Sequence, residues 1–199
     1  MWIRAVRFVI AVAVIGVCGF AAARGWSVMR FSLATMDKSA ENRHERLHAW
    51  TAVPGVAATA WKTVLPDLTA TDSLRDGLSA VLSIEPLSSP DWLWFSGLQL
   101  STNQPIETVV ESFELSMLTG PNEGEVMANR GIFALSVWDA LPAHLKDRTV
   151  TDLAVGSISS AREKLGTALS AEPEKVRSEL RTRLIAKGLS PKDLEQIGF

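Results

Sequence analysis

The segment SSPDWLWFSGLQLSTNQPIETVVESFELSMLTGP, residues 88–121, has the pattern of two antiparallel helices joined by a short polar turn. We expect Ser89 to cap the first helix and Pro90 to occupy its first helical position, where the missing N–H costs nothing. Apolar side chains recur along this helix at Trp92, Leu93, Phe95, Leu98 and Leu100. The polar run STNQ, residues 101–104, then ends the pattern and predicts a turn.

The second helix of this segment is predicted to start at Pro105. Glu107 falls in its first turn, where a carboxylate interacts favourably with the helix dipole. Its apolar face consists of Val109, Val110, Phe113, Met117 and Leu118. The sequence Thr119-Gly120-Pro121 is typical of a helix end. Residues 88–121 therefore predict a helical hairpin.

Comparable hairpins are expected on both sides of this one, within residues 55–158. Residues 56–86 contain a first helix, a break near Pro66, and a second helix from about Ser73 that Pro86 closes. After Pro121, residues 124–141 predict one long helix, and its partner lies within 146–158. Residues 159–199 are richer in charge and predict capping helices, which give a helical stack a polar outer face. In that region Ser190, Pro191 and Asp193 form a helix-start pattern.

The hairpins share residues at a spacing of 34 to 35. Leu74, Leu78, Val81 and Pro86 correspond to Val109, Phe113, Ser116 and Pro121; Gly97, Leu98 and Leu100 correspond to Gly131, Ile132 and Ala134. With a glycine midway along the first helix, a bulky residue late in the second and a closing proline, residues 55–155 resemble the tetratricopeptide-repeat (TPR) family. The resemblance implies an all-α fold: a short α-solenoid of stacked helical hairpins.

Departures from the family pattern leave a second interpretation open. Lys62 or Thr63 stands where the first unit should have its glycine, and the third unit has Pro142 early and lacks a closing proline. Unrelated helical hairpins could share this spacing by chance. In either case, one amphipathic hairpin cannot bury its own apolar face, so stacked neighbours are needed.

The resemblance also implies a binding surface, because proteins of the family generally bind partners on the concave side formed by the first helices. The candidate partner-binding residues are Asp91, Trp94, Leu98 and Asn129. The alternative for Trp94 is a core side chain. This chain lacks the lysines and asparagines with which some family members grip a peptide carboxylate, so no such clamp is predicted.

The N-terminal region 1–30 predicts a membrane anchor or a signal peptide. Residues 8–23 carry no charge, and Trp2 and Trp26 bracket a stretch that would rise about 36 Å as a helix, enough to cross a bilayer. A cleavable signal peptide ending in the alanines at 21–23 is the alternative. Both interpretations place the C-terminal domain on the extracytoplasmic, periplasmic side; a buried helix of a cytosolic protein is a third. Residues 31–54 are predicted to form a polar juxtamembrane helix or stalk.

One motif has a catalytic pattern. His44-Glu45-Arg46-Leu47-His48 matches H-E-x-x-H, in which two histidines one helical turn apart bind zinc and the glutamate acts as general base. A catalytic zinc also needs a third protein ligand, for which Asp67 and Asp72 are candidates. Arg46 and the polar flanking residues favour the simpler interpretation, a solvated stalk helix.

Composition limits the remaining functions. A chain of 199 residues with 47% hydrophobic and 21% charged residues can form a core, and a net charge of −2 gives no general attraction to nucleic acid. Cys18 is the only cysteine, which excludes an intrachain disulfide. We predict no cofactor. The expected function is a non-enzymatic adaptor or accessory protein of the cell envelope, in surface-polysaccharide or secretion machinery. The alternatives are a membrane-tethered zinc metallopeptidase and a structural subunit of a membrane complex.

Overall fold

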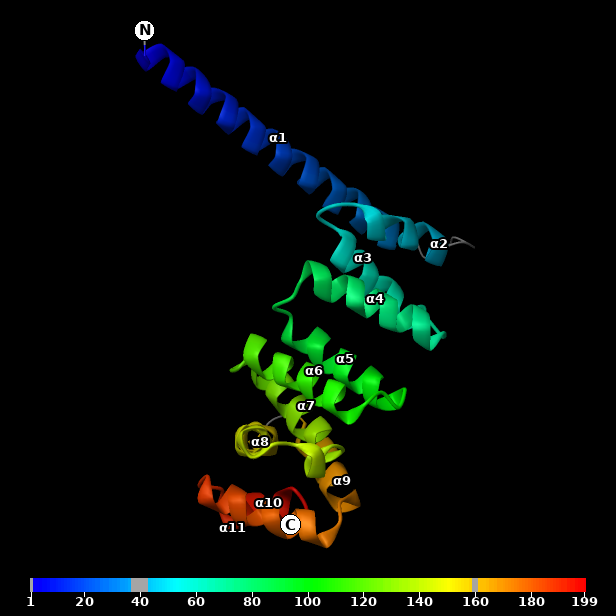
Figure 1. Cartoon of the computed structure of the whole chain (residues 1–199), viewed down its shortest axis with the longest axis vertical. Coiled ribbons are helices and arrows are strands. Elements are labelled where there is room, and N and C mark those ends of the chain that lie inside the picture. Colours follow the sequence, from blue (N-terminus) through cyan, green and yellow to red (C-terminus); the bar gives the residue numbers. More distant parts are fainter. Residues whose placement is uncertain (1, 37–42, 159–160) are drawn as a thin grey trace. The chain divides into compact units, whose positions relative to one another are not determined.

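The structure is a computed structural model, which describes residues 2–36, 43–158 and 161–199. Every regular element in these ranges is a helix, as predicted for an all-α chain (Figure 1). The chain forms two compact units, Met1–Pro86 and Leu87–Phe199. The boundary between them falls inside the predicted hairpin region 55–158. Each unit has its own hydrophobic cluster.

The first unit contains one long helix and a group of shorter ones. Its elements are α1 (Trp2–Met36), α2 (Arg43–His48), η1 (Ala49–Ala52), α3 (Ala57–Val64), η2 (Leu65–Asp67) and α4 (Thr71–Ile84). Helices α3 and α4 pack against each other, as expected for the first hairpin. The predicted break at Pro66 is a short 3-10 turn, η2, because proline is tolerated at the start of such a turn.

Helix α1 has two environments along its length. The part Val12–Met36 contains an 18-residue stretch with a mean hydropathy of 1.6, and this helix is long and apolar enough to cross a membrane. The side chains between Val12 and Trp26 are exposed. Near its C-terminal end, by contrast, Phe31 is buried with Leu47, Val56, Ala60 and Val64. The end of α1 is therefore part of the first unit's core.

Leu47 lies in the core of the first unit, and Trp50 packs against that core. Leu47 is 1% exposed, and the ring of Trp50 meets the ring of Phe31 edge-on at 5.9 Å between centroids. On the other side of Trp50, the guanidinium of Arg30 lies 6.0 Å from the indole centroid. These contacts attach the short helical segment after residue 42 to the last turns of α1.

The second unit is built from eight helical elements within the described ranges. They are α5 (Ser89–Ser101), α6 (Ile106–Thr119), α7 (Gly124–Leu135), η3 (Trp138–Ala140), α8 (Ala143–Ile158), α9 (Arg162–Ala171), α10 (Glu174–Ala186) and α11 (Pro191–Gln196). Helix α5 packs along α6 and α7 along α8, and α5 also contacts α7 (Figure 1). The hairpin predicted for residues 88–121 is therefore present.

Two local predictions in this unit are wrong. Ser88, not Ser89, is the N-cap of α5, and its side chain makes no capping hydrogen bond. Ser89 lies inside the helix, and its hydroxyl donates to the Ser116 carbonyl oxygen instead. The long helix expected over 124–141 ends at Leu135, and after a turn the chain forms η3. Trp138 is thereby buried to 2% exposure in the core.

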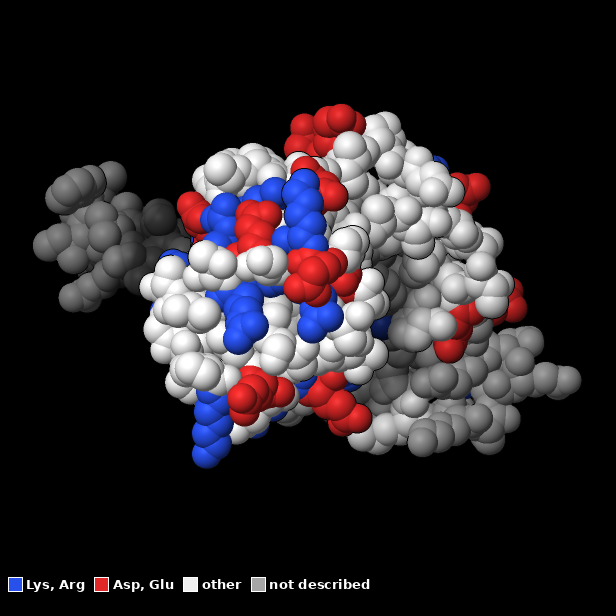
Figure 2. All heavy atoms as spheres, turned by 90° about the horizontal axis from the view of Figure 1, so that it is seen from below, with Lys and Arg blue, Asp and Glu red and all other residues white. Residues whose placement is uncertain are grey.

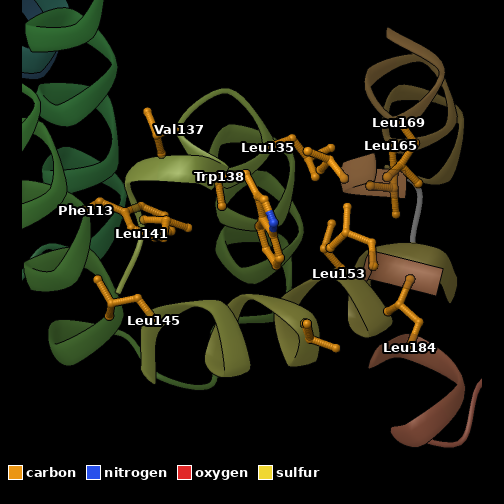
Figure 3. Close-up of a cluster of buried hydrophobic side chains, with 14 of the residues drawn as sticks. Phe113, Leu135, Val137, Trp138, Leu141, Leu145, Leu153, Leu165, Leu169 and Leu184 are labelled. Atoms are coloured by element: carbon orange, nitrogen blue, oxygen red, sulfur yellow. The ribbon is translucent and has the colours of Figure 1, made fainter. Parts of the chain in front are cut away.

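The core of the second unit surrounds this tryptophan. Figure 3 shows Trp138 between side chains from α6, α7 and the later helices. The cluster includes Phe113, Leu135, Val137, Leu141, Leu145, Leu153, Leu165, Leu169 and Leu184. Because α9 and α10 contribute Leu165, Leu169 and Leu184, the charged C-terminal region shares one core with α6, α7 and α8.

The C-terminal helices have the predicted ends and a polar exterior. Gly188 has φ +93°, a left-handed conformation that favours glycine after a helix. Ser190 and Asp193 form the capping box at the start of α11, which holds the pKa of Asp193 below its ordinary value. Seen from below, basic and acidic side chains are interspersed (Figure 2). The ion pairs that involve α10 include Arg183 with Asp147 and Arg177 with Glu174.

A buried arginine connects the four helices α5 to α8. Arg130 is 0% exposed, and its Nε donates to Asp152 Oδ2 at 2.9 Å. Its Nη1 donates to the carbonyl oxygens of Ser116 and Gly120 at 2.9 and 2.8 Å and to the Ser89 hydroxyl at 3.2 Å. The network thus includes one residue or more from each of the four helices or their ends.

At the same junction, Gly120 leaves room for the start of α5. A Cβ added to Gly120 would lie 2.4 Å from the Ser89 Cβ. Glycine at this position therefore lets the end of α6 contact the start of α5, and it leaves the Gly120 carbonyl oxygen free to accept from Arg130. Glycine is needed here because it has no side chain and not because of its backbone conformation, since any residue can adopt the φ of −137° found at Gly120.

Replacing either partner of the buried ion pair is expected to destabilise the protein. Asp152→Asn should lower the free energy of unfolding by about 3–5 kcal/mol, because it leaves a buried arginine charge without its counter-charge. Arg130→Met should behave differently with pH, since the remaining carboxyl can take up a proton whereas a guanidinium cannot lose one. Urea unfolding of the full chain in detergent at mildly acidic and neutral pH measures both effects.

The protonation of Asp152 determines whether the stability of Arg130→Met rises or falls with pH. Burial raises the pKa of this carboxyl, while the hydrogen bond and charge of Arg130 oppose the rise. Without Arg130 the folded-state pKa rises further above the unfolded value, so the folded state binds the extra proton. The stability of Arg130→Met should therefore increase as the pH falls through the folded-state pKa. Asp152→Asn lacks the titrating group and is the control; equal pH dependence of the two variants would contradict the prediction.

Alanine substitutions at Gly120 and Gly124 distinguish the effect of steric crowding on stability from the effect of helix propensity. Gly120→Ala should lower the free energy of unfolding by about 1–3 kcal/mol, because the new methyl group forces α5 and α6 apart. For Gly124, the first residue of α7, an added Cβ would have no neighbour within 4 Å among the described residues. Gly124→Ala should leave stability unchanged or raise it by up to about 1 kcal/mol, since alanine favours helix. Thermal unfolding compares the stability of the two variants. An equal loss of stability in both would show that the close approach of residue 120 to Ser89 is unimportant.

Candidate functional site

The four predicted partner-binding residues divide into an exposed pair and a buried pair. Trp94 is 39% exposed on α5, and Asn129 is exposed on α7. Leu98 and Asp91 are only 8% and 6% exposed and lie on the packed side of α5. Trp94 and Asn129 therefore remain candidates for contact with a partner. Asp91 and Leu98 offer little surface for such a contact.

Serine contacts explain why α5 presents Trp94 outward. The hydroxyl of Ser96 donates to the Val109 carbonyl oxygen at 2.8 Å, and Ser89 bonds to Ser116 near the other end of the hairpin. These buried side chains orient α5 on α6 and leave the side of α5 that carries Trp94 facing outward. The alternative in which Trp94 is a core residue is not supported by its exposure. Other exposed apolar side chains of this hairpin are Leu115 and Leu118 on α6.

The H-E-x-x-H segment forms α2, but its metal-binding geometry lies partly outside the described residues. The side chain of His44 is not among the described ones. Glu45 and His48 are exposed, and the His48 ring meets the Trp61 ring edge-on at 5.2 Å. Asp67 lies in η2 and Asp72 in the first turn of α4. Within the described part of the chain, no three histidine, cysteine, aspartate or glutamate side chains are grouped to hold a metal.

Two carboxylates that the sequence did not single out line a hollow in the second unit. Asp139 in η3 and Glu172 after α9 border a cavity of about 260 Å³, whose walls include Ile106, Pro173 and Val176. Burial, and then the negative charge of Asp139, raise the pKa of Glu172. The residues are 33 positions apart, and only the turn at η3 brings them together, so no sequence spacing could have indicated the pair.

Another cavity lies in the first unit, beside helix α1. Its volume is about 300 Å³, and residues from α1, from the turn before α3, from the first turn of α3 and from the end of α4 surround it. The charged side chains in its wall are Arg24 and Glu85. Glu85 accepts a hydrogen bond from Lys62 Nζ at 2.6 Å. The sequence placed Arg24 at the edge of the apolar segment but gave no sign that residues 54–59 and 84–85 meet it.

Metal analysis tests the H-E-x-x-H hypothesis directly. We expect the purified full chain in detergent to contain less than stoichiometric zinc, because a catalytic zinc requires a third protein ligand in addition to the two histidines. Inductively coupled plasma mass spectrometry measures the content, with His44→Ala as the comparison. One zinc per chain that disappears in His44→Ala would establish the metallopeptidase alternative, whereas His144→Ala, outside the motif, should leave the zinc content unchanged.

Comparisons of the chain with protein-family models, with curated proteins and with solved structures found no significant match.

Proposed function

We propose that this protein is a non-enzymatic, membrane-anchored adaptor of the cell envelope that holds a protein partner near the membrane. The observation that supports this most directly is the continuity of α1. Its apolar part is exposed and long enough to cross a bilayer, and its last turns pack through Phe31 into the first unit. A cleaved signal peptide has no need of such packing. The anchor interpretation is therefore preferred.

The finer proposal is a TPR-like stack whose first helices face the partner. It is supported by the pairing of α5 with α6 and of α7 with α8. It is also supported by the two glycines expected in the middle of the first helices. An added Cβ at Gly131 would lie 3.1 Å from the backbone nitrogen of Leu153, so this glycine permits close packing of α7 on α8. Gly97 has more space, with Phe133 at 4.0 Å.

For the partner surface we propose the exposed parts of α5 and α7. Trp94 supplies a large, partly exposed indole, a side chain that is enriched at the centres of protein interfaces. Asn129 adds both a hydrogen-bond donor and an acceptor. The proposed setting is the bacterial periplasmic side, within surface-polysaccharide or secretion machinery.

Replacing the indole tests the partner surface. Trp94→Ala should reduce the recovery of cross-linked partners about tenfold or more in mild detergent, since a central interface tryptophan contributes about 2 kcal/mol or more. Ile185→Ala is the matched control, because Ile185 is an apolar side chain that is 51% exposed on α10, a helix that packs against α8. Quantitative mass spectrometry of the cross-linked material gives the readout. Equal losses in both variants, or no loss with Trp94→Ala, would contradict the proposed surface.

Topology tests the location. A reporter enzyme fused after Phe199 should be active when it is of the kind that works only outside the cytoplasm, because Arg4 and Arg7 favour a cytoplasmic N-terminus. The chain should also stay in the membrane fraction after alkaline extraction. Activity of only a cytoplasmic reporter would contradict the orientation, and release by alkaline buffer would contradict the anchor.

A further inference from the structure

The cavity beside α1 combines apolar walls with one exposed arginine. Phe20, Ala23, Arg24 and Ser27 form one wall, and Pro54, Gly55, Ala57, Ala58, Thr59, Ile84 and Glu85 form the rest. Most of these side chains are apolar. Arg24 is exposed, so its guanidinium, which stays positively charged, is accessible from the cavity and from solvent.

Gly55 allows Arg24 to lie where it does. This glycine has φ +88°, and a Cβ added to it would lie 2.9 Å from Arg24 Cγ and 3.2 Å from Nε. Any other residue would be strained at this φ and would push the arginine stem away. The turn at Pro54-Gly55 thus holds the aliphatic part of Arg24 along one side of the cavity.

The remaining charge in the wall is neutralised. Glu85 forms an ion pair with Lys62, with 2.6 Å between Nζ and Oε2. Ser27 donates its hydroxyl to the Ala23 carbonyl oxygen and adds no charge. The net charge of the described cavity wall together with Lys62 is therefore positive and is carried by Arg24. An anionic group with an apolar attachment is complementary to such a wall.

The cavity lies at the membrane surface when the bilayer is placed over residues 2–24 of α1, and not over Val12–Met36, whose last turns pack in the first unit's core. From Trp2 to Arg24 a helix rises about 33 Å, close to the roughly 30 Å thickness of a bilayer's hydrocarbon core. Phe31, seven residues beyond Arg24, is packed in the first unit's core and cannot face lipid. Arg24 therefore falls at headgroup level, with the exposed side chains of Phe20 and Val17 on the hydrocarbon side.

We propose that this cavity binds one phospholipid of the surrounding membrane. Arg24 donates hydrogen bonds to the phosphate, and the upper acyl chain lies in the apolar hollow beside Phe20, Ala23 and Ile84. The inference rests on the proposed anchor function, which supplies the bilayer. The bound lipid fills the gap between α1 and the helices that follow it, and so fixes the first unit at the membrane surface.

Photo-cross-linking tests the site. The probe is a phosphatidylglycerol that carries a photoreactive group near the start of an acyl chain, used with the full chain in detergent micelles. Labelled peptides should contain residues 20–27 or 54–59. Arg24→Gln should reduce the labelling about tenfold, because a hydrogen bond to a charged group contributes about 1.5 kcal/mol. Ala23→Phe, which fills the hollow but keeps Arg24, should reduce it similarly.

Arg30→Gln is the matched control. It removes the same charge from the same helix, but Arg30 lies over Trp50 and does not line the cavity. Its labelling should stay within about twofold of the unmodified chain. Equal losses for Arg24→Gln and Arg30→Gln would show nonspecific attraction and overturn the proposal. Unchanged labelling of Arg24→Gln, or full competition by inorganic phosphate at the probe's concentration, would overturn it too.

The failure of this site can be told apart from the failure of the anchor. A chain that resists alkaline extraction but shows no labelling at residues 20–27 or 54–59 lacks the lipid site and keeps its anchor. A chain released by alkaline buffer lacks the anchor itself, and the lipid proposal falls with it. Circular dichroism of each variant confirms that helix content is unchanged before labelling is compared.

Discussion

The second unit depends on a charge that is completely removed from water. Burying an arginine is costly unless its charge is paired and its N–H groups are satisfied. Arg130 meets most of this requirement with Asp152 and with two carbonyl oxygens at the C-terminal end of α6. Its Nη2 has no hydrogen-bond partner in the part of the chain that the structure describes. These partners come from different helices, so the guanidinium is satisfied in only one arrangement of them.

Apolar packing supplies the bulk of the stabilisation, and the buried polar groups select among packings. A helix can slide or rotate along an apolar surface of a neighbouring helix at a modest cost in free energy, because one leucine contact replaces another. Sliding α7 by one turn would separate Arg130 from Asp152 and leave both charges buried. In the first unit the fit of apolar side chains selects the packing. Phe31 packs in one cluster with Leu47, Val56 and Val64 and meets Trp50 edge-on.

Helix existence was predictable from sequence because apolar residues recur at helical spacing and prolines and glycines mark the ends. The Ser190-Pro191 start of α11 was readable for the same reason, since capping is a local interaction. Features that depend on distant residues were not predictable. Ser89 had the pattern of a cap but bonds to Ser116, 27 residues away, and Val137 and Trp138 looked helical but turn inward to fill the core. For the candidate site, sequence indicated Trp94 and Asn129 but could not show that Asp91 and Leu98 are buried or that Asp139 meets Glu172.

The unbroken course of α1 has a mechanical consequence. A helix of 35 residues is about 52 Å long and stiff over that distance. The C-terminal turns of α1 are held by the contacts of Arg30 and Phe31 with Trp50. They therefore cannot rotate independently of the rest of the helix. In the proposed membrane-anchored state, a helix that changes its tilt to match a thinner or thicker bilayer must turn the packed helices of the first unit with it. Bilayer thickness would then set the orientation of these helices at the membrane surface.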